Sequence, residues 1–570
     1  MGVWLDELSE VVTGATLSLV VSELRLEETE LVTLGTKEAE LELEEPPQLV
    51  KANPSRATGN NNLVFINFPS GPSIAGFVTI KPKEKCQSLS FAFKQSPLLF
   101  FSFRLYTSRM QPKAITVQSL YADFASKKDI TKSNPVYLEG WVHTNRDNGS
   151  IGFIELNDGT CFKAIQIVYD SAIGDYAKVA HILTGAAIAV KGEIRLTPAM
   201  KQPFEVHASA ITILGDVDPD YPLQKKFHTM EYLRDIAYLR PRTNTFTALY
   251  RVRSVLAMAI HEFFQGKGFI YVHTPEITAN DAEGAGQVFT VTTDAKDPIN
   301  DFYGRRASLT VSGQLHVEAF AMAFRDVYTF GPTFRAEKSN TPRHASEFWM
   351  IEPEIAFADL DDDMALMEET IKFCIRYVLD HCPDEMAFFN TFIDKGLLEK
   401  LNHVLNTPFT HMEYTEGIKL LQEAVKNGHK FDNSNIEWGM DLQSEHERYL
   451  TEEIVKGPMF LIDYPKEIKA FYMRENDDGK TVAACDCLVP GEGEIIGGSQ
   501  REERYDVLKA KMDKIGNTKG LEWYLNLRKY GGCIHSGFGI GFDRLLMYIT
   551  GVANIRDTEP YPRTSSNLKY

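Results

Sequence analysis

The pattern of apolar and polar positions changes near residue 136. From there to residue 143 the two kinds of residue alternate, which is typical of a half-buried strand. Similar short runs follow at 152–156, 162–168, 187–194 and 204–214, and turn residues such as Asn157-Asp158-Gly159 separate them. Five short strands spaced in this way predict a five-stranded Greek-key barrel of the OB type.

Downstream of this barrel the pattern is mixed. Residues 246–264 carry apolar side chains at helical spacing, and Gly266 and Gly268 follow them. The remaining strands and helices lack regular βαβ alternation, which favours an α+β domain built on an antiparallel sheet flanked by helices. The Pro- and Asp-rich stretch at 218–226 is typical of a linker. We therefore predict an OB domain at 110–217, a linker at 218–226 and a larger domain at 227–570.

Residues 1–109 differ from the rest of the chain. The first 45 residues hold twelve acidic and only two basic side chains, whereas transit peptides are poor in acid and rich in arginine. We interpret residues 1–109 as an atypical extension that is dispensable or poorly ordered, and Met110 as an alternative start.

Composition narrows the class of protein. A chain of 570 residues with 44% hydrophobic and 24% charged residues fits a multidomain globular enzyme. It has no apolar run long enough to span a bilayer, so we predict no membrane association. The close pair Cys485 and Cys487 has no matching pair elsewhere, and we interpret both as buried free thiols. A net charge of −18 argues against broad nucleic-acid affinity and predicts a small, shape-selective RNA-binding face.

Two arginine-centred segments carry candidate chemistry. Arg335 lies in Phe334-Arg335-Ala336-Glu337, and Arg544 ends the glycine-rich segment 537–544. Arginine binds phosphate oxygens with two donors and stays charged, so two such segments suggest a clamp for a polyphosphate. The chain has neither a P-loop nor a dinucleotide-binding glycine motif between a strand and a helix. Each segment alone also fits a structural role, as an ion-paired surface strand or a close helix–sheet contact.

Taken in order, these segments resemble a known family. Residues 268–276, 335–348 and 537–544 are similar to motifs 1, 2 and 3 of class II aminoacyl-tRNA synthetases. A preceding OB domain is typical of the subgroup for aspartate, asparagine and lysine, and the chain most resembles its asparaginyl members. Further stretches that carry this resemblance lie at 282–286, 310–315, 328–337, 464–472 and 493–501. The similarity extends from about residue 119 to residue 563.

The resemblance implies an activity and its residues. Such enzymes join L-asparagine to ATP as asparaginyl-adenylate with loss of pyrophosphate, and then transfer asparagine to the 3′-terminal adenosine of tRNA(Asn). It implies that Arg335 and Arg544 are catalytic, with Arg335 bridging the asparagine carboxylate and the α-phosphate. Asp486 and Glu494 are implied ligands of Mg²⁺. The residues implied to bind ATP are Arg335, Glu337, Arg343, His344, Phe348, Glu494 and Arg544.

The choice of asparagine over aspartate is implied by charge. Glu318 would accept a hydrogen bond from the side-chain NH₂ and repel aspartate, and Arg501 would donate to the amide oxygen. Aspartyl relatives read Ser-Pro-Gln-Leu-x-Lys, whereas Val317 replaces that lysine here. The full set implied to bind the amino acid is Glu283, Ser312, Gln314, Glu318, Arg335 and Arg501.

The resemblance also implies partners. The OB barrel would read the tRNA anticodon, with Phe153 stacking on a base and Gln166 bonding its edge. From periodicity alone, Phe153 fits the barrel core equally well. Motif 1, with Pro275 near its end, would form a homodimer interface. We expect a cytoplasmic location, and an organellar one stays open.

Three other readings compete with this one. An aspartyl-tRNA synthetase of relaxed specificity is disfavoured by Val317 and Glu318. A tRNA-independent asparagine synthetase would lack the anticodon barrel. A non-catalytic RNA-binding paralogue would have lost Arg335, Arg544 or Glu494, and all three are present.

Overall fold

The computed structural model describes residues 114–280 and 287–570, and before them only the backbone of five strands. These five form a three-stranded sheet, β1-β2-β3, and a β4-β5 pair. They belong to a separate unit, Met1–Lys113, and residues 114–570 form the other. The rest of the predicted extension at 1–109 lies outside the described residues. The bounds are β1 (Leu49–Val50), β2 (Asn61–Ile66), β3 (Ile74–Thr79), β4 (Ser88–Ala92) and β5 (Phe100–Arg104).

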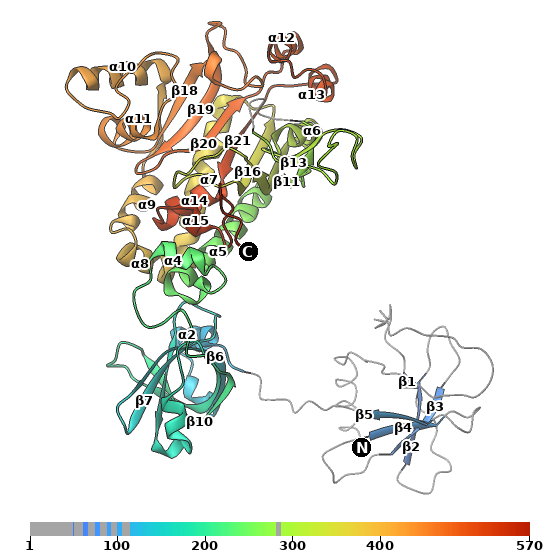
Figure 1. Cartoon of the computed structure of the whole chain (residues 1–570), viewed down its shortest axis with the longest axis vertical. Helices are drawn as coiled ribbons and strands as arrows, with labels where there is room; N and C mark the ends of the chain where they lie inside the picture. Colours follow the sequence, from blue (N-terminus) through green and yellow to red (C-terminus); the bar gives the residue numbers. More distant parts are fainter. Residues whose placement is uncertain are drawn as a thin grey trace. The chain divides into compact units, whose positions relative to one another are not determined.

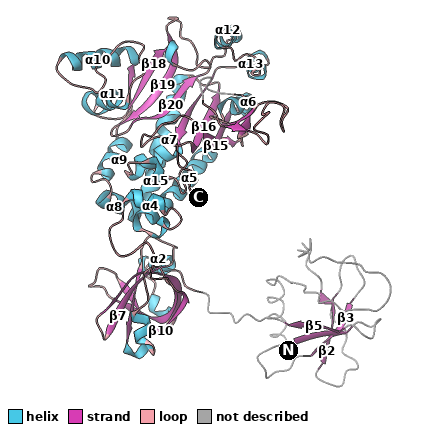
Figure 2. Cartoon of the chain, viewed as in Figure 1, coloured by secondary structure: helices cyan, strands magenta, loops and turns pink. Residues whose placement is uncertain are grey.

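The predicted OB barrel is present. Figure 2 shows it below the larger domain, and its five strands close in the order β10-β8-β7-β6-β9. Their inward side chains, among them Ile154, Leu156 and Ile167, form one apolar core with Leu120 of the preceding helix α2 (Val117–Ala125). The bounds are β6 (Val136–Asp147), β7 (Ile151–Asn157), β8 (Ile165–Asp170), β9 (Ala187–Leu196) and β10 (Phe204–Gly215).

The third strand of the barrel is shorter than its apolar run predicts. It begins at Ile165 rather than at residue 162. Phe162 instead packs edge-on against Phe388 of helix α8 (Pro383–Phe392), with ring centroids 5.5 Å apart. Lys163 pairs with Asp384 at 2.9 Å. The loop before β8 therefore contacts the larger domain instead of extending the barrel.

The larger domain is the predicted α+β fold. Its sheet has eight strands in the order β11-β15-β16-β21-β20-β19-β18-β17 (Figures 1 and 2). Only the β11–β15 and β17–β18 pairs are parallel. The bounds are β11 (Ile270–Tyr271), β15 (Asp326–Phe334), β16 (Glu347–Ala356), β17 (Thr410–Glu413), β18 (Met459–Pro465), β19 (Thr481–Val489), β20 (Gly493–Gln500) and β21 (His535–Gly541).

Helices cover this sheet and build its main core. The helix predicted at 246–264 is α5 (Asn244–Gly266), which packs with α7 (Leu360–His381) and α14 (Phe542–Thr550) on the apolar side chains of the central strands. Helix α6 (Gln314–Phe324) contacts β15 and β16. Further helices are α9 (Leu397–Asn406), α10 (Tyr414–Lys426), α11 (Ser444–Tyr449), α12 (Tyr505–Ile515) and α13 (Glu522–Lys529).

The predictions about the cysteine pair and about membrane spans can be compared with the structure. Cys485 and Cys487 are buried free thiols on β19, as predicted. None of the described helices is long and apolar enough to cross a membrane.

Candidate active site

The candidate site lies on one face of the central strands of the sheet. Side chains alternate between the two faces of a strand, so Phe348, Met350, Glu352 and Glu354 of β16 share a face. Strand β21 pairs with β16 along this stretch, from Met350 opposite Gly541 to Glu354 opposite Gly537. Strands β16 and β21 therefore form the floor of the site along this whole stretch.

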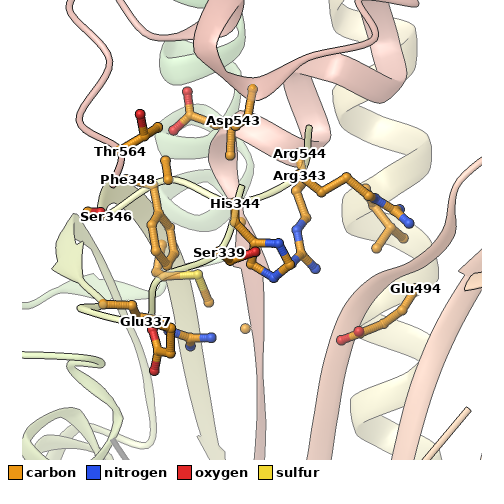
Figure 3. A pocket seen from close by; sticks show the side chains of 17 residues that line it. Glu337, Ser339, Arg343, His344, Ser346, Phe348, Glu494, Asp543, Arg544 and Thr564 are labelled. Carbon is orange, nitrogen blue, oxygen red and sulfur yellow. The ribbon is translucent and has the colours of Figure 1, made fainter. Parts of the chain in front are cut away.

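A pocket at one end of these strands gathers the residues predicted to bind ATP. Figure 3 shows Arg343, His344, Arg544 and Glu494 around one space, with Phe348 and Glu337 beside it. Arg335 lines the same pocket. Arg335 and Arg544 are 209 positions apart in the chain, yet both line this cavity. Arg335 follows β15 and Arg544 follows β21, and these two strands both pair with β16.

The loop after β15 presents its arginines to this pocket. The Arg335 N–H donates to the carbonyl of Ser346 at 3.0 Å, which closes the loop next to β16. The Arg335 guanidinium lies 5.5 Å from the centroid of the Phe348 ring. Arg343 donates to Ser444 at 2.7 Å and forms an ion pair with Glu492. These contacts position two positive groups at the pocket.

His344 reports the charge of this pocket. Partial burial lowers its pKa, and the neighbouring Arg544, Arg335 and Arg343 lower it further. The three arginines that contribute to this shift all line the pocket, which gives the cavity a positive potential. Such a cavity suits a polyphosphate.

The glycines of β21 make room on this face. A side chain at Gly537 would lie 2.4 Å from the carboxylate of Glu354, and one at Gly539 would lie 2.9 Å from Met350. After β21 the chain enters α14, where buried Asp543 pairs with Arg253 of α5. That ion pair fixes the start of the helix that carries Arg544.

Two predicted metal ligands lie on neighbouring strands. A side chain at Gly497 would lie 3.1 Å from Glu494 Oε1 and 3.6 Å from Asp486 Oδ1, so the two carboxylates converge there. Burial and the nearby Asp486 raise the pKa of Glu494. Lys469 Nζ donates to both oxygens of Asp486, at 2.9 and 2.8 Å. Glu494 lines the ATP pocket, whereas Asp486 does not.

Most residues predicted to bind the amino acid lie further along the same face. Ser312, Gln314, Glu318 and Arg501 are all buried. Ser312 donates through its hydroxyl to Glu352, whose other oxygen accepts from the Gly313 N–H at 2.8 Å. Glu283 lies within 281–286, outside the described residues.

Glu318 lies in a fully buried polar network. Its Oε1 accepts from Gln314 Nε2 at 3.1 Å, and its Oε2 lies 2.9 Å from both Arg528 Nη2 and His535 Nε2. Tyr524 Oη lies 2.8 and 2.9 Å from the two oxygens. Burial raises the pKa of Glu318, but Arg528 and His535 outweigh it and hold that pKa well below its usual range.

Arg501 is held beside this network. Its Nε and Nη2 donate to the two oxygens of Glu354, at 3.1 and 2.5 Å, and its Nη1 donates to Ser499 at 2.8 Å. A guanidinium has five N–H groups, and these bonds use three of them. Arg501 can therefore keep Glu354 and still donate to an amide oxygen.

Comparison with known proteins gives the family. Residues 229–565 match the family of class II tRNA synthetases (D, K and N), and residues 136–214 match the OB-fold nucleic acid binding domain. The chain belongs to the class II tRNA synthetases. It is 57% identical over 469 residues to an asparagine–tRNA ligase of Clostridium perfringens, which covers 80% of this chain and 99% of the relative.

Two further relatives agree. An asparagine–tRNA ligase of Bacillus cereus is 56% identical over 466 residues, covering 80% of this chain and 99% of the relative. A crystal structure of asparaginyl-tRNA synthetase from Pyrococcus horikoshii, complexed with asparaginyl-adenylate, superposes with a TM-score of 0.70 at 32% identity. It covers 80% of this chain and 99% of that chain.

Several residues of this class II synthetase site were not predicted from the sequence. Glu352 and Glu354 follow motif 2 on β16, and their alternation with Phe348 was a usable signal. Lys469, Tyr524, Arg528 and His535 gave no such signal, because each reaches the site from an element outside the three motifs or at their margin. Only the folded chain brings them together.

Proposed function

We propose that this chain activates L-asparagine with ATP, releases pyrophosphate, and transfers asparagine to the 3′-terminal adenosine of tRNA(Asn). Its family, its fold and its 56–57% identity to asparagine–tRNA ligases make it an ATP-dependent ligase of this class. The observation that carries the choice of amino acid is the buried carboxylate of Glu318, which is paired with Arg528 and lies near the buried Arg501. An acceptor and a donor side by side match a carboxamide, whereas aspartate would place a second carboxylate against Glu318.

The roles of the arginines follow from where they lie. Arg335 lines the ATP pocket and directly follows Phe334, whose N–H donates to the carbonyl of Thr310 at 2.8 Å, two residues before Ser312. We therefore assign Arg335 to the asparagine carboxylate and the α-phosphate. The pocket-lining Arg343, His344 and Arg544 then suit the β- and γ-phosphates, and Phe348 offers a flat surface for adenine. Adenylate formation needs little covalent help, so this site would act through positioning and charge stabilisation.

Mg²⁺ fits the two carboxylates near Gly497. Their oxygens are hard ligands, and Mg²⁺ is usually held by one or two carboxylates together with phosphates. No group of three or more His, Cys, Asp or Glu side chains that could hold a metal ion occurs among the described residues. When bound, the ion would neutralise charge on the polyphosphate. We propose Glu494 as its principal ligand, because Lys469 already holds Asp486.

Replacing Glu494 with glutamine should raise the Mg²⁺ concentration needed for half-maximal pyrophosphate exchange by about tenfold or more, since one anionic ligand is lost. A titration of exchange rate against Mg²⁺ measures this shift. Glu467→Gln, an exposed acid on the same domain, is the control and should leave the titration unchanged. An unchanged midpoint in Glu494→Gln would contradict the assignment of Glu494 as a Mg²⁺ ligand.

The barrel offers a surface for the anticodon. Phe153 alternates with the core residues Ile154 and Gly152, so its ring lies on the outer face and is partly exposed. Gln166 lies on the neighbouring strand β8, on the same face, because Phe153 pairs with Val168 two positions away. Gln166 Nε2 donates to Glu205 at 2.9 Å. A ring and an amide on adjacent strands support base stacking with edge recognition.

Phe153→Ala should raise the KM for tRNA(Asn) about ten- to a hundredfold, the range expected when one base loses its aromatic partner. Asparagine-dependent pyrophosphate exchange without tRNA should stay unchanged, because the adenylation site is in the other domain. Aminoacylation and exchange assays on the same preparations make this comparison. Leu196→Ala, an exposed apolar residue on β9, which pairs with neither β7 nor β8, serves as the control.

We also propose a homodimer formed through motif 1. Edge strand β11 exposes Ile270 and Tyr271, and Ile277 is exposed further along the same segment. Helix α5, which contacts β11, exposes Met258. Exposed apolar side chains gathered near a sheet edge are typical of a subunit interface.

For the location we propose the cytoplasm.

One assay separates this function from its competitors. Pyrophosphate exchange is run with asparagine and with aspartate in separate reactions, and purified tRNA(Asn) is then added. A strong preference for asparagine together with charging of the tRNA supports the proposal. Preference for aspartate would indicate an aspartyl enzyme. Formation of free asparagine from aspartate, ATP and added ammonia without tRNA would indicate an asparagine synthetase.

A further inference from the structure

Two of the four residues that contact Glu318 come from one helix outside the three motifs. Helix α13 packs with α6 and α12 in a small core that includes Leu315, Met512 and Leu525. Tyr524 and Arg528 are four positions apart on α13, and therefore on the same face of the helix. Both side chains are buried and point to Glu318.

Arg528 is itself rigidly held. Its Nε donates to the carbonyl of Glu502 at 2.9 Å, and its guanidinium lies 4.2 Å from the centroid of the Tyr524 ring. Its Nη2 lies 2.9 Å from Glu318 Oε2 and 2.9 Å from Tyr524 Oη. Glu502 directly follows Arg501 in the chain. Arg528 thus connects the backbone beside the predicted amide-oxygen donor with the predicted amide-nitrogen acceptor.

The charge of Glu318 depends on these contacts. A buried carboxylate without a partner takes up a proton, because burial disfavours the charged form. His535 carries a positive charge only when it is protonated, whereas arginine is charged at every physiological pH. A protonated Glu318 would donate a hydrogen bond where the asparagine NH₂ needs an acceptor. It would also no longer repel aspartate.

We infer that Arg528, assisted by Tyr524, is a positioning residue for amino-acid specificity, which holds Glu318 as an ionised acceptor at a fixed distance from Arg501. This inference rests on the proposed asparagine ligase function. It assigns selectivity to a helix that lies outside the three motifs and does not line the nucleotide pocket. Gln314 supports it, because its own side-chain amide donates to Glu318 Oε1 in the same chemical way as an asparagine side chain would.

The test compares Arg528→Met with Arg528→Lys in the full chain. Methionine keeps much of the length of the side chain but removes its charge and donors, whereas lysine keeps the charge. We expect Arg528→Met to raise the KM for asparagine about ten- to a hundredfold, as for loss of a hydrogen bond to a charged group. It should lower the ratio of asparagine to aspartate activation by a similar factor. The KM for ATP should change less than about threefold, since the nucleotide pocket is separate, and Arg528→Lys should recover part of both losses.

Two further variants keep the result interpretable. Lys529→Met removes an exposed cation from the neighbouring position of the same helix and should behave as the unaltered protein. Tyr524→Phe removes only the hydroxyl next to Glu318, and should raise the KM for asparagine severalfold without unfolding the chain. It replaces Arg528→Met as the deciding variant if thermal unfolding shows that Arg528→Met does not fold.

The outcomes divide clearly. Selective loss for asparagine, with ATP binding kept and partial recovery by lysine, supports the inference. Equal changes in the KM for ATP and asparagine, or an unchanged asparagine-to-aspartate ratio in a folded Arg528→Met, would overturn it. Failure of the unaltered protein to activate asparagine would instead contradict the proposed function, so the two failures are distinguishable.

Discussion

Arg335→Ala should reduce asparagine-dependent pyrophosphate exchange by at least about a hundredfold. The guanidinium lies at the start of the motif 2 loop, over the Phe348 ring and inside the pocket shared with Arg544. In the proposed reaction, negative charge builds up at the α-phosphate as asparagine attacks. Arg335 would stabilise that charge with donors already in place, and an interaction that strengthens in the transition state lowers kcat as well as raising KM.

The measurement is kcat and KM of exchange for both ATP and asparagine. Arg335→Lys tests whether the two-donor geometry matters, and we expect it to recover only a small part of the loss. Arg376→Ala removes an arginine of α7 that does not line this pocket, and it should leave exchange unchanged. A loss below about tenfold in Arg335→Ala, roughly 1.4 kcal/mol, would contradict a transition-state role.

The architecture was accessible from the sequence because its signals are local. The alternation in β6 and the helical spacing in α5 reflect which face of each element is buried, so both elements can be predicted from their own residues. The bounds were less accessible. Phe162 has the apolar character of a barrel strand, but its ring finds a better partner in Phe388 of the other domain. That contact depends on how two domains meet, which no local pattern encodes.

The candidate site divides in a similar way. Arg335 and Arg544 could be named because each belongs to a contiguous motif, and the structure brings them to one cavity. Glu318 could be named as well, yet the sequence does not reveal that it is fully buried. Its partners Arg528 and His535 come from α13 and β21, more than two hundred positions away. What makes Glu318 a usable acceptor is therefore a property of the fold and not of its motif.

This burial has an energetic consequence for specificity. Glu318 and Glu354 are both fully buried, and each is matched by a guanidinium group, Arg528 for the first and Arg501 for the second. Removing one member of such a pair is costly, because the remaining charge is left unpaired in a medium of low dielectric. A ligand that brings a further carboxylate into this cluster would also place an unpaired negative charge in a medium of low dielectric. Exclusion of aspartate would thus come from the whole paired cluster and not from Glu318 alone.

Glu318→Gln should therefore lower the ratio of asparagine to aspartate activation by about a hundredfold or more, while ATP binding stays nearly unchanged. Glutamine has nearly the same shape but no charge, and one of its two polar atoms is a donor where Glu318 accepts. Asparagine would lose the acceptor for its NH₂ group. Aspartate would lose the like charge that repels it, and Arg528 would be left with a positive charge that attracts it.

Pyrophosphate exchange with each amino acid, over a full range of concentrations, measures this ratio. The matched control is Glu385→Gln, because Glu385 is also a buried glutamate paired with an arginine, Arg251 at 2.7 Å, but lies on α8 away from the site. A comparable loss of thermal stability in both variants, with altered selectivity in Glu318→Gln alone, would separate recognition from folding. An unchanged kcat/KM for asparagine in Glu318→Gln would show that this carboxylate does not read the amide, because a buried charge that touches the ligand cannot be removed without cost.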